Sequence, residues 1–142
     1  MDDAYHVNSQ MDHRGGCGFE ENTGDGAGIL MALPDSFFRA EAKKIEINLP
    51  EIGQYAVGNI FLPTDQSERE FCIKKTESII KEENQICLGW REVPVDPEGA
   101  NVGPAARGAQ PYIKQLFIQC SEGISQDAVS YTHLTLPTTL PV

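Results

Sequence analysis

The sequence contains no long apolar run, few cations and no secretion signal at its start. No stretch approaches the roughly 20 apolar residues that cross a bilayer, so we expect no transmembrane helix and no membrane partner. Lys and Arg number 11 against 21 Asp and Glu, a formal net charge of −10, and the cations are scattered. Because a phosphate backbone would be repelled, we expect no nucleic-acid partner. The chain opens on acidic and polar residues, which predicts that it is not secreted.

Closely spaced metal ligands are missing as well. The cysteines form no CxxC pair, and the histidines have no HxxxH spacing and do not pair with cysteines. We therefore expect no metal site. Without a secretion signal, the thiols are expected to stay reduced. The cysteines are Cys17, Cys72, Cys87 and Cys120.

The most informative feature present is a glycine-rich stretch. His13–Gly18 reads HRGGCG and Gly24–Ile29 reads GDGAGI, and an apolar run follows directly. Glycine lets the backbone adopt positive φ and approach other groups closely. Such a loop either closes over a small ligand or makes a tight turn into a buried strand, and spacing alone leaves both open.

Several known site patterns are absent from this stretch and from the rest of the chain. There is no GxGxxG, no P-loop, no calcium loop, no GxSxG and no HExxH. What remains is Arg14, whose guanidinium can hold a carboxylate with two parallel hydrogen bonds or bind carbonyls of its own loop. Asp25 can meet an ammonium group or cap the following element.

The chain of 142 residues is about one domain long. Its apolar patterns, interrupted by proline and glycine, predict a mixture of helices and strands. We expect strands at 29–33, 54–62, 86–93 and 112–120, helices at 37–43 and 65–84, a helix tail within 1–12 and a long loop at 94–107. Asp65 with Glu68 has the spacing of a capping box. The inward face of that helix is expected to carry Cys72, Thr76, Ile79, Ile80 and Glu83.

The end of the sequence differs in composition from the rest. No charge occurs after Asp127, and Ser130–Val142 consists almost wholly of Thr, Leu and Pro. We expect residues 1–128 to form the domain, and 129–142 to be a disordered or non-native tail outside it.

The glycine-rich motifs resemble the N-terminal glutaminase domain of the glutamate synthase large subunit. The HRG…DGAGI arrangement is similar to that of class II glutamine amidotransferases in general. The RGGCG and GDGAG motifs are more specific and resemble those of glutamate synthase. Three later parts share the resemblance, which covers about 11–118: Gly53–Gly58 with Phe61–Pro63, Leu88–Asp96, and Gln110–Phe117.

The resemblance implies an α+β chain with an incomplete four-layer αββα N-terminal-nucleophile hydrolase fold of two stacked sheets. It implies glutamine as substrate, with Arg14, Gly15 and Asp25 binding it. An N-terminal cysteine would form a thioester, activated by its own α-amino group, whose pKa is near 8. The released ammonia would react with 2-oxoglutarate in a flavin domain. FMN and an iron–sulfur cluster are implied for the parent enzyme, none for this chain. The implied compartment is the cytoplasm or a plastid.

The sequence departs from the family at the nucleophile. It begins Met1-Asp2, so the reacting cysteine is expected upstream, and no catalytic residue is assigned within the chain. Cys17 is an alternative if cleavage after Gly16 freed it. We expect the polypeptide alone to be inactive and prone to aggregate, its remaining partners being the other domains of a glutamate synthase. Another class II amidotransferase, or a non-catalytic acidic domain that binds a small molecule or a protein, stays open, and so does the electron donor.

Overall fold

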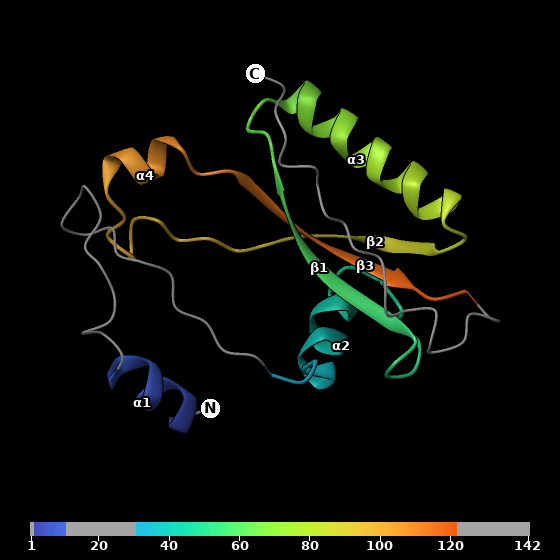
Figure 1. Ribbon diagram of the computed structural model, residues 1–142, viewed down its shortest axis with the longest axis horizontal. Coiled ribbons are helices and arrows are strands. Elements are labelled where there is room, and N and C mark those ends of the chain that lie inside the picture. Colours follow the sequence, from blue (N-terminus) through green and yellow to red (C-terminus); the bar gives the residue numbers. More distant parts are fainter. Residues whose placement is uncertain (1, 11–30, 122–142) are drawn as a thin grey trace, which may run out of the picture.

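Three strands form one antiparallel sheet in the computed structural model, which describes residues 2–10 and 31–121 (Figure 1). They are β1 (Tyr55–Leu62), β2 (Ile86–Glu92) and β3 (Tyr112–Gln119), in the order β1-β3-β2. Both outer strands run antiparallel to β3. β3 is therefore the strand with a neighbour on each side.

Helices lie on both faces of this sheet. The helices of the described part are α1 (Asp2–Gln10), α2 (Asp35–Lys43), α3 (Gln66–Glu82) and α4 (Pro104–Gly108). α2 and α3 lie on opposite sides of the strands (Figure 1). The ring of Phe38 in α2 meets Phe117 of β3 edge to face, with centroids 6.1 Å apart. On the other face Trp90 Nε1 donates to Glu77 Oε1 of α3 at 2.9 Å. None of the described helices is long and apolar enough to cross a membrane.

Coverage on both faces explains the burial of β3. Successive side chains of a strand point to opposite faces, yet Gln115, Leu116 and Phe117 are all buried in a row. Phe117 has no exposed surface and Leu116 only 3%. Phe117 packs under α2 and Leu116 faces the side of α3, so the core of the described part has two layers with β3 between them.

The predicted helix at 65–84 is confirmed as α3, and so is its cap. Asp65 is the N-cap residue, and its side chain accepts the Glu68 backbone N–H at 2.9 Å. Of the predicted inward face, Ile80 is buried and Cys72 and Thr76 are partly buried. The prediction is wrong for Ile79 and Glu83, because both side chains are exposed. Arg69 and Ile73 are partly buried in their stead.

The three later strands and the first helix also agree with the sequence. The strands expected at 54–62, 86–93 and 112–120 are confirmed within one residue at each end, the helix at 37–43 begins two residues earlier at Asp35, and the helix tail near the start is α1. The expected loop at 94–107 is wrong at its end, because α4 begins there. Pro104 occupies its first turn, where a missing N–H costs no hydrogen bond.

The strand expected at 29–33 is wrong for the part that the structure describes. Residues 31–33 are not in a strand, and residues 29 and 30 lie outside the described ranges. The Asp35 N–H donates to Leu33 O at 2.9 Å and the Phe38 N–H donates to Pro34 O at 3.1 Å, so the chain turns directly into α2. Met31 is 47% exposed, unlike a buried strand residue.

The α+β class is confirmed, whereas the stack of two sheets is not confirmed by residues 2–10 and 31–121, which hold one sheet. The boundary between a domain at 1–128 and a tail at 129–142 falls outside the described residues and stays a prediction.

The sheet has one irregularity, a bulge in β2. The pairing with β3 shifts between Cys87 and Gly89, and Gly89 has φ 146°. A Cβ built at Gly89 would lie 2.7 Å from Ile47 Cδ1. Glycine therefore permits both the left-handed backbone and the close packing of the segment after α2.

Replacing Phe117 by alanine should lower the free energy of unfolding by about 3 kcal/mol or more, because it leaves a cavity between β3 and α2. Urea denaturation followed by circular dichroism measures this change. Phe71→Ala is the matched control, since Phe71 is 70% exposed on α3 and its truncation should have little effect. Equal effects of the two substitutions would contradict the assignment of Phe117 to the core.

Candidate functional site

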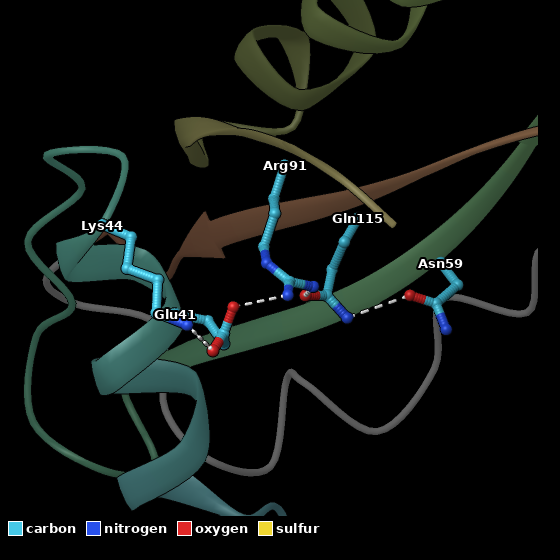
Figure 2. Close-up of polar contacts among 5 residues, drawn as sticks. All are labelled: Glu41, Lys44, Asn59, Arg91 and Gln115. Carbon is cyan, nitrogen blue, oxygen red and sulfur yellow. Dashed lines mark hydrogen bonds and ion pairs between the residues drawn. The ribbon is translucent and has the colours of Figure 1, made fainter. Parts of the chain in front are cut away.

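A row of polar side chains crosses the sheet on the face covered by α2. Asn59 of β1 pairs in register with Gln115 of β3, which pairs with Arg91 of β2. Strand alternation places these side chains on the same face as Phe117. Figure 2 shows the row continuing to Glu41 of α2 and to Lys44 just after that helix. We call Asn59, Gln115, Arg91 and Glu41 the polar row.

Each member of the polar row bonds to the next. Gln115 Nε2 donates to Asn59 Oδ1 at 3.0 Å, and Gln115 Oε1 accepts from Arg91 Nη1 at 3.3 Å. Arg91 Nη2 donates to Glu41 Oε2 at 2.6 Å. Lys44 Nζ lies 2.5 Å from the other carboxylate oxygen of Glu41 (Figure 2). The chain of contacts thus ties all three strands to α2.

Burial makes the ion pair at the end of the row consequential. The side chains of Arg91 and Glu41 are only 13% and 16% exposed, while Lys44 is 67% exposed. Hydrogen bonds from Lys44 and then from Arg91 hold the pKa of the Glu41 carboxyl below its usual range. No buried side-chain nitrogen or oxygen in the described residues is without a partner. The buried polar atoms of the row thus have hydrogen-bond partners within the described residues, and the row holds the three strands and α2 together.

A second charged cluster joins the start of α2 to β1. Arg39 donates to the Asp35 carboxylate through Nε at 2.9 Å, and its two Nη atoms donate to the carbonyl oxygens of Leu49 and Pro50. The Tyr55 hydroxyl donates to Asp35 Oδ1 at 2.8 Å. Burial and the Asp35 carboxylate raise the pKa of Tyr55 to about 12. This cluster holds α2, the segment that follows it and β1 together.

The substrate-binding residues predicted from the sequence lie outside the described part of the chain. Arg14, Gly15 and Asp25, and also Cys17, fall within residues 11–30. Their assignment therefore stays a prediction, and the structure brings none of them together with the polar row.

Three of the four cysteines lie within the described residues. Cys72, Cys87 and Cys120 form no disulfide with one another and are of intermediate burial, and their reduced state stays a prediction. Burial raises the pKa of the Cys87 thiol, so at neutral pH it is not an activated nucleophile. Residues 2–10 and 31–121 contain no group of three His, Cys, Asp or Glu side chains that could hold a metal ion.

Sequence reasoning missed the polar row. The signal available was a polar residue inside each of the three strands, namely Asn59, Arg91 and Gln115. These residues can be recognised as neighbours only when the strand pairing is known, because they are far apart in sequence. Asn59 and Gln115 are 56 positions apart, and Arg91 and Gln115 are 24 apart.

Replacing Glu41 by glutamine should destabilise the fold at neutral pH and leave it nearly unchanged in acid. Because the folded-state pKa of Glu41 is lowered, the stability it adds is present above the unfolded pKa and is lost as the pH falls through the folded pKa. Urea denaturation at pH 7 and at about pH 3 measures the difference. Glu98→Gln, at an exposed position, is the control. A Glu41→Gln effect that persists undiminished in acid would contradict the charge role.

Comparison with known proteins assigns the chain to a family. The model of the class II glutamine amidotransferases matches residues 1–135. The glutamate synthase [NADPH] large chain of Bacillus subtilis is 42% identical over 83% of this chain and 8% of its own length. Ferredoxin-dependent glutamate synthase 2 of Synechocystis is 36% identical over 82% of this chain and 7% of its own length. Glutamate synthase [NADH] of Saccharomyces cerevisiae is 37% identical over 80% of this chain and 5% of its own length.

The chain thus spans less than a tenth of the length of these relatives. The match agrees with the resemblance carried by the HRGGCG and GDGAGI motifs, and it extends through the strands and helices of the described sheet. The chain belongs to the class II glutamine amidotransferases, and it is similar to the N-terminal amidotransferase domain of the glutamate synthases.

Proposed function

We propose that this chain is part of the glutaminase domain of a glutamate synthase, which hydrolyses glutamine to glutamate and ammonia. The observation that carries the proposal is the family match over residues 1–135 together with relatives that are named glutamate synthases. The ammonia would be used with 2-oxoglutarate to make a second glutamate. Glutamine and the other domains of the enzyme are the proposed partners.

Three residues are proposed to bind glutamine. Arg14 suits the α-carboxylate, because a guanidinium offers two parallel N–H donors to two carboxylate oxygens. Asp25 has the charge to receive the α-ammonium group. Gly15 leaves the backbone beside Arg14 free to approach the ligand closely. The proposed roles are supported by the chemistry of the residues and by their positions in the family motif.

The nucleophile is proposed to come from chain outside these 142 residues. Attack on the carboxamide needs a thiol with a base beside it, and a free α-amino group on the cysteine itself supplies that base. The attack forms a thioester and releases ammonia, and water then hydrolyses the thioester to glutamate. Cys17 is the alternative, and it would need cleavage after Gly16 to acquire a free amino group.

FMN and an iron–sulfur cluster are proposed only for other parts of the enzyme. The described residues hold no group of three His, Cys, Asp or Glu side chains that could bind a metal ion. The relatives are named for NADPH, NADH and ferredoxin, so they do not separate the electron donors. A cytoplasmic or plastid location is proposed, since relatives from Arabidopsis thaliana are named chloroplastic.

The binding role can be tested in a chimera. The matching segment of the Bacillus subtilis large chain is replaced by residues 11–121 of this chain, and ammonia release from glutamine is measured. We expect activity to be retained. Arg14→Ala should then raise KM for glutamine about 10- to 100-fold, the loss of a charge-assisted hydrogen bond, and Arg14→Lys should not restore it.

Lys75→Ala, on the exposed side of α3, is the control for the chimera and should leave KM unchanged. An inactive, folded chimera would contradict the glutaminase assignment. An active chimera that is indifferent to Arg14→Ala would contradict the role of Arg14 alone.

The 142-residue polypeptide by itself should release no ammonia from glutamine, because it lacks an N-terminal thiol. A coupled glutamate dehydrogenase assay measures the release. Sustained release that Cys17→Ser abolishes would contradict the prediction and would identify Cys17 as the nucleophile.

A further inference from the structure

The Asp35 carboxylate joins the first turn of α2 to two other segments. Asp35 Oδ1 accepts the Tyr55 hydroxyl at 2.8 Å, and Asp35 Oδ2 accepts Arg39 Nε at 2.9 Å. Arg39 in turn donates to the carbonyl oxygens of Leu49 and Pro50. One carboxylate thus ties the start of α2 to β1 and to the segment that leads into β1.

The contact between Asp35 and β1 is largely buried. Tyr55 is only 7% exposed, and the Asp35 side chain is 26% exposed. A buried hydroxyl requires a hydrogen-bond partner, and a hydrogen bond to an ionised carboxylate is stronger than one between neutral groups. The guanidinium of Arg39 also lies 6.0 Å from the centroid of the Tyr55 ring. These contacts favour one position of the first turn of α2 on β1.

The residues that enter α2 are fixed to the helix through their backbone. The Asp35 N–H donates to Leu33 O, and the Phe38 N–H donates to Pro34 O. The ring of Pro34 restricts its φ, which is −77°. The position of the first turn therefore determines where the chain stands at residues 33 and 34. Asp25, which is proposed to bind the ammonium group of glutamine, precedes Asp35 by ten positions.

We propose, on the basis of the proposed glutaminase function, that Asp35 is a positioning residue for glutamine binding. Its carboxylate holds the first turn of α2 on β1. That position of α2 sets the place from which the chain leads back to Arg14 and Asp25. Asp35 does not contact glutamine, and it acts through the helix that it begins.

The kinetic effect follows from two positions of the first turn of α2, docked on β1 and released. Glutamine binds the docked form, so its apparent affinity falls in proportion to the docked fraction. The bound complex is the same in either case, and kcat is therefore kept. General destabilisation has a different effect, because it lowers the amount of folded enzyme. It reduces the apparent kcat and leaves KM unchanged.

The chimera described above tests the proposal, because it places these residues in a whole enzyme. Asp35→Ala should raise KM for glutamine about tenfold, with kcat kept within about twofold. Tyr55→Phe removes one oxygen atom and should raise KM about threefold, because Asp35 keeps its hydrogen bond from Arg39. Ammonia release over a range of glutamine concentrations measures both KM and kcat.

Tyr112→Phe is the matched control. The Tyr112 hydroxyl also donates to a carboxylate, that of Glu92, but this hydrogen bond joins β3 to β2. The substitution removes the same atom as Tyr55→Phe and should leave KM unchanged. The double variant Asp35→Ala with Tyr55→Phe should have the KM of Asp35→Ala alone, because the Tyr55 hydroxyl acts through the Asp35 carboxylate.

An active chimera whose KM is unchanged by Asp35→Ala and by Tyr55→Phe overturns the proposal, whatever happens to kcat. Equal rises of KM with Tyr55→Phe and Tyr112→Phe overturn it as well. Where Asp35→Ala does not fold, Tyr55→Phe against Tyr112→Phe decides. A folded chimera without ammonia release contradicts the proposed function itself, and the positioning role of Asp35 is then overturned with it.

Discussion

The described structure depends on covering the central strand β3 on both faces. Phe117 is completely buried and packs against Phe38 of α2, while Leu116, its neighbour in sequence, is buried toward α3. A strand with two apolar faces has no stable arrangement at a surface, so it requires an element on each side. This requirement explains why α2 and α3 lie on opposite sides of one sheet (Figure 1).

Gln115 adds a second constraint, because a buried amide must find partners on both sides. It does so with Asn59 on one strand and Arg91 on the other. A slip of one residue in either pairing would turn one of these side chains to the opposite face and leave the amide unsatisfied. The polar row therefore selects the register of the sheet. The ion pair between Arg91 and Glu41 extends the same constraint to α2.

The sequence predicts the elements that depend on residues close together in the chain, and it does not predict contacts between residues far apart in the chain. α3 is encoded locally, by Asp65 three residues before Glu68, and both its existence and its cap were correct. The three strands also have local apolar patterns that end at proline or glycine. The polar row was missed because its partners are far apart along the chain and meet only through the sheet. The strand expected at 29–33 was wrong at 31–33 because an apolar run does not distinguish a strand from a turn that leads into a helix. The roles of Arg14, Gly15 and Asp25 rest on the family motif and stay predictions.

The two charged clusters give α2 a role in the proposed function. Asp35, with Arg39 and Tyr55, fixes the start of the helix to β1, and Glu41, with Arg91, fixes its last turn to β2. The chain enters α2 from the glycine-rich segment through Met31 and Pro34. Because α2 is anchored to the sheet at both ends, the sheet fixes the position of the chain shortly after the residues proposed to bind glutamine.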